Sequence, residues 1–457
     1  MTDAAAMDRD PEPASGLFAP EWRALTIGCI ALISMLAFES LAVTTAMPSI
    51  AAALDGLDAY ALAFGATLAT SVLGMVVAGQ RCDRDGPRGT LRAGVLVFAG
   101  GLALAGFAID MTTLVLGRAL LGFGSGQLGV ALYVAVGRLY PPSMRPRIFA
   151  MFAAAWVVPA LVGPALASLM VAAFGWRSVF LAVLVLLPLA WWWVDPALRP
   201  LHGDAAIATD ARRRLVAAGV AAIAALLLHL LGQQAAPRPW LIGVVVIVLA
   251  TASASLLPAG TLAARGGLPT VIALRGLLAA AFFTAEAFLP LWLQQRQAWS
   301  VLAAGLAISA GALCWSAGSQ TQARLTRVPR PRILRVGLIV VALGLTAITV
   351  CATGAWPGAL SVVAWLACGF GVGLSFPSLS VRLLELSAAN EQGRNSAALQ
   401  LADALATTVA LALAGLAFVP LHRLAPTYAF SAVFSLASGL IVLAAILAPR
   451  AWHIGVR

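Results

Sequence analysis

Long apolar runs, separated by short charged or Pro- and Gly-bearing breaks, make up most of this chain. Most runs have about 17–25 residues, the length that an α-helix needs to cross the hydrocarbon core of a bilayer. We count fourteen runs, so the pattern predicts an all-α polytopic membrane protein with fourteen transmembrane helices. The runs lie near residues 23–50, 59–80, 91–109, 112–137, 147–173, 178–194, 214–232, 239–257, 270–294, 300–322, 333–353, 358–387, 394–420 and 426–448.

The charged residues lie mainly in the breaks, and their distribution predicts the orientation of the chain. An even number of spans places both termini on one side of the membrane. The termini and loops of that side contain 24 arginines, Arg275 among them, whereas the loops of the other side contain four. Because basic loops favour the cytoplasm, we expect both termini there. All 29 basic residues are arginines, which indicates a GC-rich bacterial genome and a bacterial cytoplasmic (inner) membrane.

The composition excludes several classes of function. The chain is 61% hydrophobic and only 10% charged, which rules out a soluble globular protein. The net charge of +11 comes from loop arginines, so no nucleic-acid partner is expected. The five cysteines are scattered without a CxxC pattern, and we expect neither a metal nor another cofactor. The sequence also lacks the common hydrolase and ATP-binding motifs, which argues against an enzyme.

The longest break separates two halves of the chain. It bears proline and charged residues, and a linker is expected there. A weak internal repeat supports two pseudo-symmetric halves, because Phe288-Leu-Pro290 echoes Ala46-Met-Pro48. The expected divisions are a cytoplasmic tail at 1–22, a six-helix half at 23–194, a cytoplasmic linker at 195–213, two inserted transmembrane helices at 214–257, a second six-helix half at 258–448 and a cytoplasmic tail at 449–457.

The break between the second and third runs has a dense pattern of glycine and charge. It reads G-x3-D-R-x-G-x-R-x2-L, from Gly79 to Leu91. A tight turn needs the backbone freedom of Gly86, and a charged pair at a helix end can bond to neighbouring helix termini. We therefore expect an ordered turn on the cytoplasmic side. Its pattern residues are Gly79, Asp83, Arg84, Gly86 and Arg88.

This turn resembles the signature loop of the major facilitator superfamily. In that family it acts as a cytoplasmic gating latch, which holds the two halves together in one state and releases them in the other. The run at 112–137 adds Leu114-x3-Arg118-x3-Gly122, which resembles the family's buried-arginine motif. Small residues in such a run let helices approach closely. The resemblance implies the major facilitator fold of two six-helix halves.

Two further features resemble one branch of this superfamily. The sequence Pro159-Ala-Leu-Val-Gly163-Pro164 is similar to the antiporter motif of its exporters. The count of fourteen runs is similar to the drug:proton antiporters, which insert two helices between the halves. In the first helix that family has an acid nine residues before a proline, and here Glu39 stands nine residues before Pro48. The resemblance implies that Glu39 is the coupling carboxylate.

Four ionisable residues lie inside apolar runs and are candidates for proton coupling and substrate binding. At about 1.5 Å rise per residue, Glu39, Arg118 and Glu286 share a layer roughly 12–13 Å below the outer surface. Asp403 lies in the inner half of the membrane. A charge at such depth is costly unless it is paired, neutralised or hydrated, so each residue is a functional hypothesis, with a structural ion pair as the alternative. We expect protonation of Glu39, shared with Glu286, to alternate with substrate binding.

The sequence therefore predicts a secondary transporter that exports small lipophilic or cationic compounds or drugs in exchange for protons by alternating access. The alternatives are an exporter of a specific endogenous metabolite, lipid or siderophore, a channel, and a membrane-embedded enzyme. The expected partners are a small-molecule substrate and the lipid bilayer, with the chain acting as a monomer. Aromatic side chains that could line an apolar cavity, with a lipid-facing or packing position as the alternative for most of them, include Phe38, Trp156, Phe282, Trp315 and Phe376.

Overall fold

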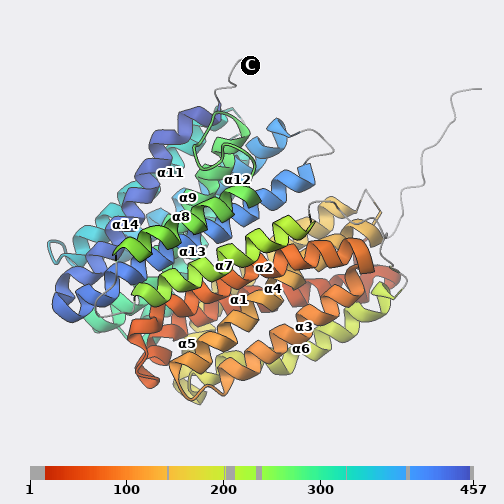
Figure 1. Cartoon of the computed structure of the whole chain (residues 1–457), viewed down its shortest axis with the longest axis horizontal. Helices are drawn as coiled ribbons and strands as arrows, with labels where there is room; N and C mark the ends of the chain where they lie inside the picture. The colour runs from red at the N-terminus through yellow and green to blue at the C-terminus, as the bar shows by residue number, and fades with distance from the viewer. Residues whose placement is uncertain are drawn as a thin grey trace, which may run out of the picture.

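The computed structural model describes residues 16–141, 144–199, 201, 211–232, 239–325, 327–387 and 392–452. Within them it contains fourteen α-helices, two short 3-10 helices and no strand, so the all-α class is confirmed (Figure 1). The elements are α1 (Pro20–Ala53), η1 (Leu57–Ala59), α2 (Tyr60–Asp85), α3 (Pro87–Gly106), α4 (Met111–Leu139), α5 (Arg145–Phe174), α6 (Arg177–Leu198), α7 (Ala211–Gly232), α8 (Pro239–Leu256), α9 (Leu268–Arg296), α10 (Val301–Arg324), α11 (Arg330–Ala352), α12 (Leu360–Leu386), α13 (Gln392–Leu424), α14 (Pro426–Leu447) and η2 (Ala448–Ala451).

The fourteen helices correspond one to one with the fourteen apolar runs, but several extend beyond them. The second run was expected to end near residue 80, whereas α2 continues to Asp85. The thirteenth was expected at 394–420, whereas α13 spans Gln392–Leu424. Hydrophobicity marks only the part of a helix that belongs in hydrocarbon, and polar residues beside it can continue the same backbone hydrogen bonding.

Helices α1–α6 and α9–α14 form two bundles with the same internal packing, which we call the N-half and the C-half. In the N-half α4 packs against α2 and α3, and in the C-half α12 packs against α10 and α11. Figure 1 shows the red-to-yellow N-half beside the blue-green C-half. The halves meet where α2 packs on α13 and α5 packs on α10. This repeated packing is what two pseudo-symmetric halves require.

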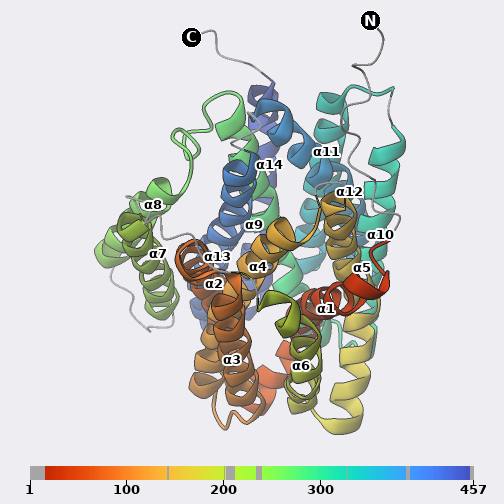
Figure 2. The same cartoon turned by 90° about the vertical axis from the view of Figure 1, so that its right-hand side faces the viewer.

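The hairpin of α7 and α8 lies on the outside of the two halves. The two helices pack on each other, and α7 also packs on α2 and α13, as Figure 2 shows. The contact is rich in small residues, with Ala218 and Ala225 of α7 in one buried cluster with Val72 of α2. In the described part of the chain, the other twelve helices are long and apolar enough to cross a membrane, whereas α8 has a shorter apolar stretch, Trp240–Leu256. That α7 and α8 also cross remains a prediction.

Glycines on α4 allow the close packing at the centre of the N-half. A Cβ atom added at Gly122 would lie 2.0 Å from the carbonyl oxygen of Thr67, and one at Gly126 would lie 2.2 Å from that of Ser71. Both carbonyls belong to α2, so any larger residue would push α4 away from it. The expectation that small residues in this run let helices approach closely is confirmed.

Two polar contacts between the halves lie at one end of the molecule. We call the end where α1 begins the terminal end, and the end where α1 finishes the distal end. At the distal end Arg423 of α13 forms an ion pair with Asp58 of η1. The hydroxyl of Tyr60 on α2 donates a hydrogen bond to the backbone carbonyl of Ala287 on α9 at 2.6 Å. The structure is thus held together across the halves on its distal side.

Candidate functional site

A buried ion pair joins the first and fourth helices of the N-half. The guanidinium Nη1 of Arg118 on α4 donates to the carboxylate of Glu39 on α1. The side chains are only 4% and 5% exposed. The Nε of Arg118 also donates to the carbonyl oxygen of Ala63 on α2 at 3.1 Å. Since removing charges from water costs several kcal/mol per ion, each member of this pair depends on the other.

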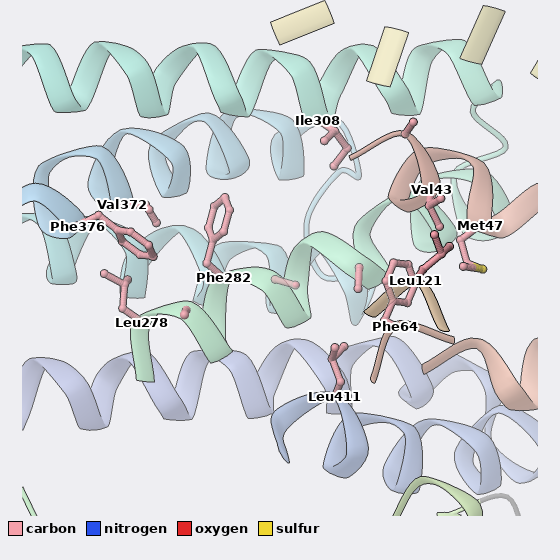
Figure 3. Packing of buried hydrophobic residues seen from close by; sticks show 14 of the residues in the cluster. Val43, Met47, Phe64, Leu121, Leu278, Phe282, Ile308, Val372, Phe376 and Leu411 are labelled. Carbon is pink, nitrogen blue, oxygen red and sulfur yellow. The ribbon is translucent and has the colours of Figure 1, made fainter. Parts of the chain in front are cut away.

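Aromatic rings connect this pair to the C-half. The ring of Phe64 lies 6.0 Å from the guanidinium carbon of Arg118, and Figure 3 shows it near Leu121. The ring of Tyr60, one turn earlier on α2, lies 5.4 Å from that of Phe64. Tyr60 in turn reaches α9 through its hydrogen bond to the carbonyl of Ala287. A displacement of Arg118 would therefore change the packing of Phe64 and Tyr60, and with it the hydrogen bond between the halves.

The predicted layer of three ionisable groups is joined only in part. Glu39 and Arg118 form a direct ion pair. Glu286 on α9 is half-buried and does not join this pair. Among the described residues, Glu286 has no ion pair and no side-chain hydrogen bond. Its neighbour in the chain, Ala287, carries the carbonyl that Tyr60 binds. Glu286 thus lies beside the contact between the halves without a fixed partner.

Asp403 has an arginine partner that the sequence did not reveal. The Nε of Arg275 on α9 lies 3.1 and 3.0 Å from the two carboxylate oxygens of Asp403 on α13. Arg275 was assigned to a cytoplasmic loop, and this was wrong. It lies inside α9, seven residues after Leu268, and its side chain bonds to Asp403 of α13 and Ser380 of α12. The available signal was the run Thr-Val-Ile-Ala-Leu directly before this arginine, which already has the hydrophobicity of a buried segment.

The expected signature turn lies between α2 and α3. Gly86 has φ of +85°, a conformation that favours glycine, and Pro87 begins α3 with the fixed φ that a first helical turn accepts. Arg84 pairs with its exposed neighbour Asp85, and the hydrogen bond from Arg84 lowers the pKa of that carboxyl. A Cβ at Gly79 would meet nothing within 4 Å.

The charged side chains of this turn pair within their own half. Arg88 donates to the carboxylate of Asp195 on α6 at 2.9 and 3.0 Å. In the C-half, Arg330 of α11 pairs with Glu385 of α12 near the same end of the molecule. The side chain of Asp83, another pattern residue, lies outside the described residues. The gating role that the resemblance implies for this turn therefore remains a prediction.

The segment that resembles the antiporter motif lies at the junction of the halves. Pro159, Gly163 and Pro164 fall inside the continuous helix α5. The hydroxyl of Ser168, one turn later, donates to the carbonyl of Pro164 at 2.7 Å and lies 3.1 Å from the carbonyl of Val301 at the start of α10. This motif segment therefore takes part in a third contact between the halves on the distal side.

Comparison with known proteins identifies the family. A sequence model described as the Major Facilitator Superfamily matches residues 27–410. The chain belongs to this superfamily. It is therefore a multi-pass membrane transporter and not an enzyme.

Sequence relatives of this major facilitator protein are similar over about a third of the chain. It is 30% identical over 156 residues to the "Multidrug resistance protein 3" of Bacillus subtilis (strain 168), a match that covers 34% of this chain and 30% of that protein. It is equally similar to the "Multidrug transporter protein MdtP" of the same organism, with 34% and 29% covered. The chain thus matches less than a third of the length of these relatives.

Solved structures share the fold across nearly the whole chain. The POT family transporter PepTSo has a TM-score of 0.71 at 13% identity, with 94% of this chain and 98% of that chain covered. A POT family transporter in complex with 5-aminolevulinic acid has a TM-score of 0.69 at 15% identity, with 94% and 96% covered. At such low identity the likeness shows the fold alone, and it confirms the expected major facilitator fold.

Proposed function

We propose that this protein exports small lipophilic or cationic compounds in exchange for protons. The observation that carries the proposal is the buried pair of Glu39 and Arg118, which joins two helices of the N-half and reaches the C-half through Tyr60. The names of the Bacillus subtilis relatives, both multidrug proteins, support the export of drugs. No covalent chemistry and no cofactor are needed, because the proton gradient supplies the free energy.

The coupling step is an exchange of partners at Glu39. Protonation neutralises the carboxylate and removes the attraction that holds Arg118. A buried arginine without a partner is costly by several kcal/mol, so Arg118 must find a new one. Glu286, half-buried and unpaired beside the carbonyl that Tyr60 binds, is the acid of the C-half on the same side of the molecule. This exchange would weaken the distal contacts and so favour opening toward that side.

The direction of export follows from the arginine distribution. Without Arg275, which lies within α9, 23 arginines remain on the side of the termini, and this bias favours the terminal end in the cytoplasm of a bacterial cell. The distal contacts described above would then close the outer side, so that substrate enters from the cytoplasm or the inner leaflet. We propose that the observed structure is this state, and that the protein works as a monomer.

The proposal is tested by efflux from cells that express Glu39→Gln. Glutamine keeps the size of the side chain and can still accept from Arg118, but it cannot exchange a proton. We expect ethidium efflux driven by the proton gradient to be lost, while the amount of folded protein in the membrane stays the same. The matched control is Glu21→Gln, which removes an exposed carboxylate from the same helix and should leave efflux unchanged.

Two results would contradict the proposal. Efflux by the wild-type protein that survives a protonophore would exclude proton antiport. Efflux by Glu39→Gln with the wild-type pH dependence would exclude Glu39 as the coupling group. Dye efflux that is absent in the wild type, with proton release caused instead by one endogenous metabolite, lipid or siderophore, would support the alternative of a specific exporter.

A further inference from the structure

The C-half holds a charged side chain in surroundings that are typical of a cation-binding site. The guanidinium of Arg275 contacts both carboxylate oxygens of Asp403 on α13, at 3.1 and 3.0 Å. Its Nη1 donates to the hydroxyl of Ser380 on α12 at 3.1 Å. Its central carbon lies 3.7 Å from the centre of the Phe376 ring, also on α12. A carboxylate, a hydroxyl and a ring face thus surround one cation, and together they favour a cation with partly apolar surface.

Further aromatic rings pack around Phe376, the ring that Arg275 contacts. The ring of Trp315 on α10 lies 5.0 Å from that of Phe376 and 5.4 Å from that of Phe282 on α9. Phe282 is stacked on Trp365 of α12 at 4.6 Å. Figure 3 shows Phe282 and Phe376 on different helices of this region, and Trp315 contacts both rings. Aromatic rings from three helices therefore pack into one cluster next to the Arg275–Asp403 pair, in which Phe282 and Trp365 are buried and Trp315 is partly exposed.

This pair is also more open than the pair in the N-half. The side chains of Arg275 and Asp403 are 15% and 21% exposed, against 4% and 5% for Arg118 and Glu39. Arg275 lies seven residues from the start of α9, or about 10 Å from the terminal end of that helix. The long side chain of an arginine at such a depth can extend toward water at the helix end. The exchange proposed below moves the Arg275 guanidinium from Asp403 toward water at this end of α9.

We propose that Asp403, Phe376 and Ser380 form the loading site for a monovalent organic cation, such as a quaternary phosphonium or ammonium ion with aromatic groups, and that Arg275 occupies this site when substrate is absent. The proposal rests on the proposed function of the protein as an exporter. Binding is an exchange of one cation for another, so the carboxylate of Asp403 keeps a partner throughout. Release of the substrate toward the distal side lets Arg275 return.

The exchange predicts that removal of Arg275 strengthens binding. The test is equilibrium binding of tetraphenylphosphonium to the purified full-length protein in lipid nanodiscs. We expect Arg275→Met to bind about tenfold more tightly than the wild type, because the internal competitor is gone, and Asp403→Asn to bind at least about tenfold more weakly, because the charge partner is gone. The matched controls are Arg335→Met and Asp55→Asn, which change exposed residues and should bind like the wild type.

A purely structural ion pair gives a different set of results. In that case Arg275→Met and Asp403→Asn would both lower thermal stability and both weaken binding, and this outcome would overturn the proposal. Unchanged binding in a folded Asp403→Asn variant would overturn it as well. If neither variant folds, Phe376→Leu decides the question, because it leaves the ion pair intact. We expect Phe376→Leu to bind tetraphenylphosphonium more weakly than the wild type and to bind the neutral triphenylphosphine oxide equally well. Binding of the cation as tight as in the wild type would refute the site.

The binding test is independent of proton coupling. Loss of proton-driven efflux together with the expected binding pattern would contradict the proposed function and leave the cation site intact. Intact efflux together with wild-type binding in Asp403→Asn would contradict the site and leave the proposed function intact.

Discussion

The interdependence of Glu39 and Arg118 makes a prediction about stability that does not need the substrate. Arg118→Met removes the partner of a carboxylate that is 5% exposed. Breaking a buried pair from one side costs about 3–5 kcal/mol, because the remaining charge is left uncompensated. The variant also loses the hydrogen bond from Nε to the carbonyl of Ala63, worth about 1 kcal/mol net. The two effects together give an expected destabilisation of about 4–6 kcal/mol.

Two measurements separate destabilisation by the unpaired charge of Glu39 from destabilisation by lost packing. In the double variant Glu39→Gln/Arg118→Met no charge remains in the pocket, so it should be clearly more stable than Arg118→Met alone. The destabilisation of Arg118→Met should also be smaller at acidic than at alkaline pH, because protonation of Glu39 removes the unpaired charge. Loss of packing alone would give the same penalty in the single and double variants and no dependence on pH.

The five cysteines of the chain provide the assay. Cys29, Cys82, Cys351 and Cys368 are buried free thiols, so a thiol-reactive dye reports their exposure when the protein unfolds on heating. The control is Glu385→Gln, which breaks two surface pairs, with Arg330 and with Arg382, of a carboxylate that is 38% exposed. Such a pair is worth about 0–1 kcal/mol. Equal melting temperatures for Arg118→Met and Glu385→Gln would refute the reasoning.

Two further predictions concern packing and the distal contact. Gly126→Ala places a Cβ 2.2 Å from the carbonyl of Ser71 and should cost about 1–3 kcal/mol in the same melting assay. The control is Gly129→Ala, whose Cβ meets nothing within 4 Å and which should be neutral or stabilising. Equal effects of the two substitutions would contradict the packing argument. Tyr60→Phe removes the hydrogen bond to the carbonyl of Ala287, worth about 0.5–1.5 kcal/mol, and should shift the population toward a distally open state by about two- to tenfold; unchanged distances between spin labels on the distal loops of the two halves would contradict it.

The hydrophobicity pattern predicted the fold well, because it reports which residues lie within the hydrocarbon core of the membrane. A run of apolar residues must be helical in lipid, so each run gave one helix. The pairing of Glu39 with Arg118 was also accessible, since both residues lie deep inside long runs where a lone charge is costly and few partners exist. The glycines of α4 gave the same kind of signal, because small residues at helical spacing indicate a close helix neighbour.

The sequence did not reveal the partner of Asp403, because hydrophobicity does not distinguish a buried arginine near a helix end from an arginine in the adjoining loop. Arg275 follows a stretch of only a few apolar residues, and counting it with the loop arginines fitted the charge bias equally well. Whether such an arginine turns toward water or toward a neighbouring helix depends on its direction around the helix axis. That direction is set by the packing of α9 against α12 and α13, which hydrophobicity does not report.

The two ion pairs suggest how the halves divide the work of transport. Each half joins an arginine to an acid on another of its helices, Arg118 with Glu39 in the N-half and Arg275 with Asp403 in the C-half. The first pair is almost completely buried, and it is the pair at which we propose that a proton is exchanged. The second is more exposed and contacts the ring of Phe376, and it is the pair at which we propose that a bulky cation is exchanged. If the two exchanges are linked through the contact of Tyr60 with α9, protonation of Glu39 in the N-half changes the affinity of the C-half for the substrate. Such a coupling of two binding events is the physical requirement for antiport.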